Sequence, residues 1–150
     1  MLATDSVALN PNPLVQALGK PADEFTRADI IRFVTEQSIP MLNLRYVGGD
    51  GRLKELNFAI QSVAHLDRIL TMGERVDGSS LFDVVDATSS DLYVVPQLRT
   101  AFLNPFTALP TLDIMCGFYD VEGNPLVSAP QQILRKAQEA LEAETGCRLE

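Results

Sequence analysis

Alternating apolar and polar side chains mark several strands along this chain. Residues 41–47 alternate, a glycine-rich turn follows at 48–51, and a second alternating run covers 52–60. A period of two predicts half-buried strands, and the intervening glycines predict a hairpin between them. Residues 112–119 alternate in the same way and predict a central strand.

Helical spacing of apolar residues predicts four helices, each begun by a capping side chain. A short one follows Asn12-Pro13, and a longer one must end before Pro40, which cannot continue a helix. A third has apolar residues at helical spacing until Gly73, and the last runs toward Gly146. The predicted caps are Asn12, Thr26, Ser62 and Ser128.

Residues 91–95 and 100–103 predict two more short strands, which Pro96 and Pro105 limit. The resulting order is helix, hairpin, helix and further strands, which predicts an α+β fold of the β-grasp type. We expect a mixed sheet of about five or six strands with a helix packed across one face, plus N-terminal and C-terminal helices.

Three parts follow from these elements. Residues 1–25 form an N-terminal arm with a short helix, 26–127 form the β-grasp domain, and 128–150 form a helix leading out of it.

The composition predicts one globular core. A chain of 150 residues with 46% hydrophobic content buries one core, and a net charge of -8 argues against a nucleic-acid or anionic-membrane partner. The chain shows neither a leader pattern at its start nor a long apolar run, so we expect a cytoplasmic protein.

The chain is poor in metal-binding side chains. Cys116 and Cys147 match neither a disulfide framework nor a zinc site, so we expect two free thiols. With His65 as the only histidine, the sequence predicts no metal site and no cofactor site within these residues.

The segment 72–81 carries the candidate chemistry. Gly73 predicts the end of a helix, and Asp77-Gly78 predicts a tight turn followed by the hydroxyls of Ser79 and Ser80. A carboxylate and two hydroxyls within four residues suit a small cation or an amine. The alternative interpretation is a polar, bent loop that is only a solvated turn.

The spacing beyond this loop resembles that of the glutamine synthetase family. The motif at 76–80 is followed, after eight residues, by 89–94. Further similar motifs follow in order at 104–106, 112–119, 122–126 and 133–137. The resemblance extends from about residue 12 to residue 146. One departure lies in the first motif, where Val76 occupies a position that is usually aromatic in this family.

The resemblance implies that a much larger catalytic domain follows the β-grasp domain in this family. That domain carries the glutamates that bind Mg or Mn and the sites for ATP and glutamate, and none of these is present here. The chain is then either a cut piece of a longer protein or a naturally short homologue. A long helix with nothing after it favours the cut piece.

The resemblance also assigns roles to Asp77 and Ser80. In the full-length enzyme, Asp77 would bind ammonium and help take its proton, and Ser80 would line the same site. Both would reach the active site of a neighbouring subunit in a homo-oligomeric ring. We therefore expect the chain alone to be inactive, and to be a monomer or an adventitious dimer.

Other functions stay open at this point. Val84 and Val85 stand where the family often has glycines and a tryptophan, so a pocket for a bulkier amine, as in γ-glutamyl-polyamine ligases, is an alternative. A second alternative is a non-catalytic β-grasp module for oligomerisation or regulation. The acceptor amine, the ring size and any regulation are not fixed by these residues.

Overall fold

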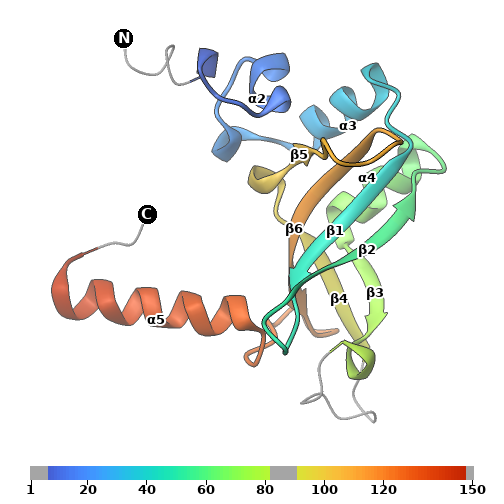
Figure 1. Cartoon of the computed structure of the whole chain (residues 1–150). Helices are drawn as coiled ribbons and strands as arrows, with labels where there is room; N and C mark the ends of the chain where they lie inside the picture. The colour runs from blue at the N-terminus through green and yellow to red at the C-terminus, as the bar shows by residue number, and fades with distance from the viewer. Residues whose placement is uncertain (1–6, 82–90, 148–150) are drawn as a thin grey trace.

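A mixed six-stranded sheet forms the centre of the molecule in the computed structural model, which describes residues 7–81 and 91–147 (Figure 1). The strand order is β2-β1-β6-β4-β3, with the short β5 pairing beside β6. β1 and β6 are parallel, and all other pairs are antiparallel. The strands are β1 (Met41–Val47), β2 (Leu53–Ala59), β3 (Glu74–Asp77), β4 (Asp91–Pro96), β5 (Phe102–Leu103) and β6 (Thr111–Tyr119).

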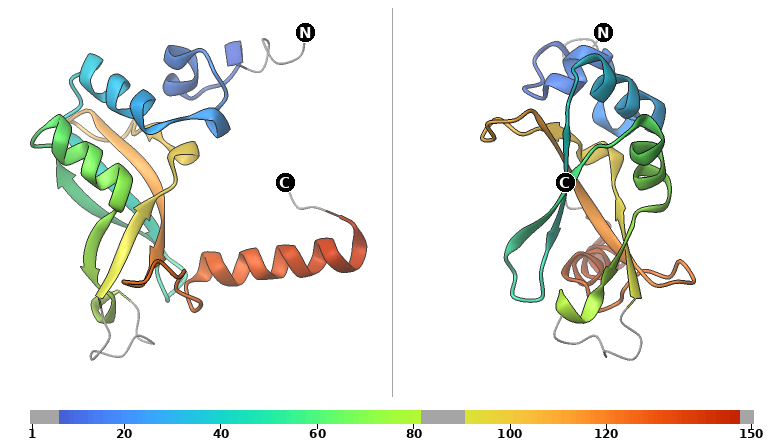
Figure 2. Two further views of the ribbon diagram at one scale, coloured as in Figure 1. Left: turned by 180° about the vertical axis from the view of Figure 1, so that it is seen from behind. Right: turned by 90° about the vertical axis from the view of Figure 1, so that its right-hand side faces the viewer.

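Two helices cover one face of this sheet. α4 lies on the strands and contacts β4, and α3 packs beside α4 at the upper end of the sheet (Figure 2). The sheet and its covering helices confirm the predicted α+β β-grasp fold. The helices are α2 (Pro13–Leu18), α3 (Arg27–Glu36), α4 (Val63–Met72) and α5 (Pro130–Thr145), with 3-10 turns η1 (Ala22–Glu24), η2 (Gly78–Ser80) and η4 (Leu98–Thr100).

The core lies between the sheet and these two helices. Alternate residues of β1 and β6 point into it, as the period-two pattern predicts, and α3 and α4 contribute their apolar stripes. The rings of Tyr46 and Phe118 meet edge to face, with centroids 5.1 Å apart. Val63 is 54% exposed, so it does not extend the α4 stripe. The strand residues of the core are Leu42, Leu44, Tyr46, Leu92, Val94, Leu112, Ile114, Cys116 and Phe118.

Most predicted helix starts are confirmed. Asn12 accepts from the backbone of Leu14, and Ser62 accepts from the backbone N–H of His65. Thr26 and Asp29 form a reciprocal capping box at the start of α3. Each cap satisfies donors that the first helical turn leaves without a partner.

The prediction that Ser128 caps the last helix is wrong. α5 begins one residue later, and Ala129 occupies the cap position without a side-chain hydrogen bond. The chain is held along β6 by a backbone bond from Leu126 to Phe118, and Ala129 then bonds back to Leu126. Ala129 is 1% exposed, so close packing, not a polar cap, determines where the helix starts.

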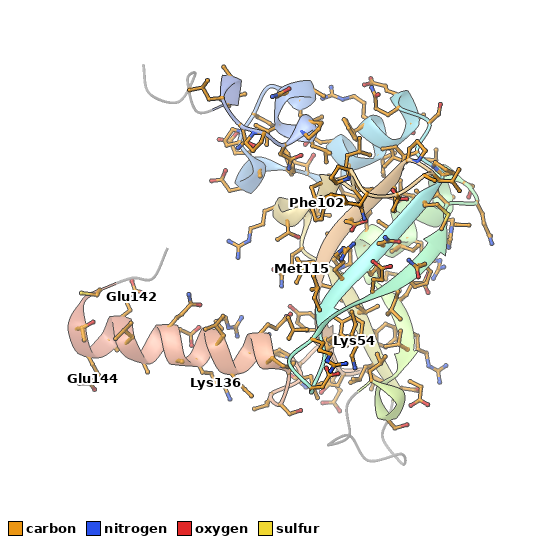
Figure 3. The ribbon with its side chains drawn as sticks, in the orientation of Figure 1. Lys54, Phe102, Met115, Lys136, Glu142 and Glu144 are labelled. Carbon is orange, nitrogen blue, oxygen red and sulfur yellow. The ribbon has the colours of Figure 1, made fainter. Side chains whose placement is uncertain are left out.

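α5 leaves the body of the molecule after its first turns (Figure 1). The side chains of Lys136, Glu142 and Glu144 stand clear of the sheet in Figure 3. Its apolar residues are exposed too, with Ile133 at 59% and Leu134 at 58%. The helix thus presents an apolar stripe that no described residue covers.

The sheet face opposite the helices is polar beside β5, where Asp113 of β6 lies. Asp113 is 0% exposed there and pairs with Arg45, which also contacts Glu55 at 3.0 Å. Asn104 donates to the same Asp113 oxygen, at 3.0 Å. A buried carboxylate needs such partners, because losing water without them is costly.

Both cysteines are free thiols, as predicted. Cys116 is buried in β6, and burial raises the pKa of its thiol well above the ordinary value, so it stays protonated. Cys147 is exposed. Within residues 7–81 and 91–147, no helix has the length and apolar character needed to cross a bilayer.

Candidate functional site

The segment that the sequence predicts as a bent loop begins as a strand. Glu74–Asp77 forms β3, which pairs with β4 in antiparallel register. Gly73 has φ +74° and its Cα lies against the backbone of Val94, where a Cβ would come within 2.4 Å of the carbonyl oxygen. Because only glycine fits this approach, the chain passes from α4 directly into β3. The predicted turn is limited to η2, after Asp77.

Asp77 ends β3 and caps η2. Its Oδ1 accepts from the backbone N–H of Ser79 at 3.0 Å and from the Ser79 hydroxyl at 2.7 Å. The Asp77 side chain is exposed, so the carboxylate lies at the protein surface beyond the core. The structure therefore brings Asp77 and Ser79 together, as the spacing predicts.

Ser80 closes the 3-10 turn through its backbone. Its side chain lies outside what the structure describes, so its place beside Asp77 stays a prediction. Ser89 and Ser90 of the second motif, and Val84 and Val85 between the two motifs, also lie outside the described residues.

A second aspartate faces Asp77 across the strands. Asp77 and Asp91 are direct partners in the β3–β4 register, and Asp91 forms a 2.5 Å ion pair with Arg75. Asp91 raises the pKa of the Arg75 guanidinium through this contact. Asp91 belongs to the motif at 89–94, but the sequence does not indicate that it lies opposite Asp77. That pairing depends on residues 74–77 forming a strand.

These polar residues share one face of the sheet. Leu92 and Val94 point toward the helices, so their neighbours in β4, Asp91 and Tyr93, point to the opposite, open face. Cross-strand partners lie on the same side, which places Arg75 and Asp77 on the open face as well.

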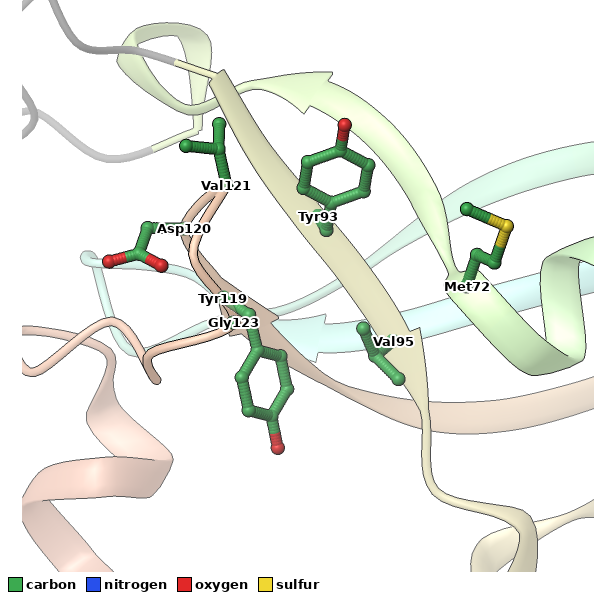
Figure 4. A pocket seen from close by; sticks show the side chains of 7 residues that line it. All are labelled: Met72, Tyr93, Val95, Tyr119, Asp120, Val121 and Gly123. Carbon is green, nitrogen blue, oxygen red and sulfur yellow. The ribbon is translucent and has the colours of Figure 1, made fainter.

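An apolar groove lies further along this open face. It has a volume of about 450 Å³ and collects side chains from the end of α4, from β4 and from the end of β6 (Figure 4). Tyr93 and Tyr119 are cross-strand partners within it. The lining residues are Met72, Tyr93, Val95, Tyr119, Asp120, Val121 and Gly123.

Asp120 at the groove is occupied by the turn that it caps. Its carboxylate accepts from the backbone of Glu122 at 2.9 Å and from Asn124 at 2.8 Å. The Asn124 side chain and these backbone donors lower the pKa of Asp120. Across the described ranges, His, Cys, Asp and Glu side chains nowhere gather in a group of three that would suit a metal ion.

Comparison with known proteins identifies the family and the fold. The family described as "Glutamine synthetase, beta-Grasp domain" matches residues 38–121, which is more than half of the chain. The chain is 28% identical over 124 residues to the glutamine synthetase of Staphylococcus aureus strain Mu50, and 27% identical to that of Staphylococcus epidermidis strain RP62A. These matches cover 81% of this chain and 27% of each relative.

Solved structures have the same fold. Plasmodium falciparum glutamine synthetase matches with a TM-score of 0.66 at 19% identity, covering 80% of this chain and 23% of that one. The ligand-free structure of GmaS also gives 0.66, at 14% identity, covering 78% and 27%. The chain thus spans about a quarter of the length of these relatives. It belongs to the glutamine synthetase family, through the family's β-grasp domain.

Proposed function

We propose that this chain is the N-terminal domain of a glutamine synthetase, in which Asp77 helps to bind ammonium at the active site of a neighbouring subunit. The observation that carries this proposal is the position of the Asp77 carboxylate, exposed at the end of a short strand pair. A carboxylate there is accessible to a second protein surface.

The chemistry requires such a group. Glutamine synthesis proceeds when ATP phosphorylates the γ-carboxylate of glutamate and ammonia displaces the phosphate. Ammonium cannot attack while it is protonated, so a fixed carboxylate that stabilises the cation and helps to take its proton favours the reaction. Ser79 restrains the Asp77 carboxylate through two hydrogen bonds, which supports this positioning role. Ser80 would line the same site.

The other parts of the reaction belong to the remainder of the enzyme. Because the chain spans 27% of its curated relatives, we assign the ATP, glutamate and Mg or Mn sites to a separate catalytic domain. The chain alone would be inactive, and the complete enzyme would be a cytoplasmic homo-oligomeric ring.

Asp77→Asn in the full-length enzyme tests the proposal. We expect kcat/KM for ammonium to fall by about 100-fold, because the amide can neither neutralise the cation nor accept its proton. The KM values for glutamate and ATP should change much less. Glutamine formation at varied ammonium concentration gives these constants, and light scattering checks that the ring is intact.

Asp50→Asn is the matched control, since Asp50 is an exposed turn aspartate in the β1–β2 hairpin. It should leave all constants unchanged. If Asp77→Asn retains full activity, the proposal is wrong and the non-catalytic β-grasp module is favoured.

A bulkier amine is the second candidate acceptor. The groove formed with Tyr93, Val95 and Tyr119 lies on the same open face as Asp77 and offers apolar surface to an alkyl chain. The same assay with methylamine and putrescine in place of ammonium separates the two substrates. A higher kcat/KM with putrescine would assign the enzyme to the γ-glutamyl-polyamine ligases.

A further inference from the structure

A second cleft lies away from Asp77, between η4 and the first half of α5. It has a volume of about 480 Å³, and its lining is mainly polar. Two guanidinium groups line it: Arg99 comes from η4 and Arg135 from α5. Four glutamines and the side chain of Tyr119 complete the polar wall, while the same cleft contains no Asp or Glu.

The polar groups of this wall are largely without partners. In the described part of the chain, Arg99 and the lining glutamines make no side-chain hydrogen bond or ion pair. Arg135 has one contact, at 3.5 Å to Glu139 on the same helix, and both side chains are more than half exposed. Such a pair contributes little and leaves the guanidinium available for another anion.

Gln132 adds a donor to the cleft. The residue is 5% exposed and lines the cleft, and its amide has no hydrogen-bond partner among the described residues. The amide atoms keep some access to solvent. The side chain is therefore available to donate to an oxygen-bearing ligand in the cleft.

The backbone is shaped to hold this wall in place. A Cβ at Gly117 on β6 would lie 2.8 Å from the Gln131 amide nitrogen and 3.0 Å from the Tyr119 ring. The absence of a side chain at Gly117 therefore lets Gln131 and Tyr119 close against the sheet. The donors come from three elements, η4, α5 and β6.

The electrostatics favour a negative ligand. The chain carries a net charge of -8, yet this cleft gathers two arginines and no acidic side chain. Gln131 and Gln132 lie in the first turn of α5, where the helix dipole is positive and no side-chain cap is present. Guanidinium groups bind carboxylate and phosphate oxygens with paired, charge-assisted hydrogen bonds.

We propose that the cleft between η4 and α5 is a binding site for a small dianion, either a dicarboxylate or a phosphate. Arg99 and Arg135 bind the two negative ends or edges of the ligand, and the amides of Gln131 and Gln132 donate to its remaining oxygens. The cleft shares no residue with the Asp77 loop, and Tyr119 lines both this cleft and the apolar groove.

Titration of the 150-residue chain with inorganic phosphate and, separately, with succinate tests the proposal at constant ionic strength. Side-chain N–H signals of arginine and glutamine, followed by ¹⁵N NMR, should shift saturably with one of the two probes. The tighter probe identifies the ligand as phosphate-like or dicarboxylate. Succinamide, which has the same length and no charge, should give no shift.

Arg99→Gln and Arg135→Gln should each weaken binding about tenfold, because each removes one charge-assisted contact. Both arginines are exposed, so the variants should keep the wild-type backbone spectrum. Arg52→Gln is the matched control, an exposed arginine in the hairpin turn, and should bind like wild type. No saturable shift with either probe, no loss in the two variants, or an equal loss in Arg52→Gln would overturn the proposal.

Discussion

Helices α4 and α5 carry the same kind of apolar stripe but bury it to opposite degrees. In α4, Ile69 is 0% exposed and Leu66 is 1% exposed, because the helix lies on the sheet. In α5, Ile133 and Leu134 are both more than half exposed. Only the first turn of α5 is packed, through Gln132 and the preceding Ala129.

The difference teaches what a hydrophobic pattern does and does not specify. Helical periodicity indicates a face that needs burial, because isolated helices gain most of their stability from packing. It does not identify the packing partner. For α4 that partner is within the described residues, whereas for α5 it is not.

The glycines that end the two helices should show the largest contrast. Gly73→Ala should lower the free energy of unfolding by about 4 kcal/mol, because its positive φ and the carbonyl of Val94 both oppose a Cβ. Gly146→Ala meets no atom within 4 Å and should cost only about 1 kcal/mol for its positive φ. Urea unfolding of both variants measures the two values. Equal losses would contradict the difference in packing at the two ends.

Truncating one isoleucine in each helix should give the next largest contrast. Ile69→Ala should cost about 3 kcal/mol, because it removes buried methyl groups and leaves a cavity. Ile133→Ala should change stability by less than about 0.5 kcal/mol, since an exposed residue loses little packing and alanine favours helix. Thermal and urea unfolding compare the pair. A large loss in Ile133→Ala would mean that α5 packs on a surface in solution.

The starts of the packed helix α3 and of α5 should give the smallest contrast. Lys20 and then the Thr26 hydroxyl lower the pKa of Asp29 from 3.8 to about 2. Ionised Asp29 therefore contributes stability that is complete above about pH 4 and is lost as the pH falls through about 2. Asp29→Asn should cost about 1 kcal/mol at pH 7.

The difference in unfolding free energy between wild type and Asp29→Asn should become smaller as the pH falls from 4 to 2. Urea unfolding at several pH values in this range measures it. A gap that stays constant with pH would show that the Asp29 carboxylate is not stabilised in its ionised form. α5, which begins without a side-chain cap, has no corresponding acid-sensitive contact at its start.

Much of the fold could be predicted because local patterns agreed with the tertiary structure. The hairpin of β1 and β2, the long strand β6 and the caps Thr26 and Ser62 all follow from periodicity and capping chemistry. The sequence does not predict β3, because its four residues between a helix and a turn show too little alternation. Its existence depends on the close approach of Gly73 to β4, which is a tertiary contact.

The candidate site was predicted less completely. Turn chemistry indicates Asp77 as a candidate, and its hydrogen bonds to Ser79 follow from the spacing of the two residues. The opposing Asp91 depends on strand register, which no local pattern near residue 77 reveals. Arg99 and Arg135 are 36 positions apart in the sequence and come together only because the chain passes through β6 between them. No local sequence pattern therefore predicts their cleft.

The position of β6 constrains the order in which the protein can be completed during synthesis. β1, β4 and β5 all pair with this one strand, and it is the last of the six along the chain. The early hairpin ends at Ala59, and one edge of β1 therefore stays unpaired until β6, which begins 52 residues later at Thr111, has left the ribosome. A nascent chain that stalls before Thr111 would expose the unpaired edges of β1, β4 and β5 together. The risk of aggregation is therefore greatest during this interval.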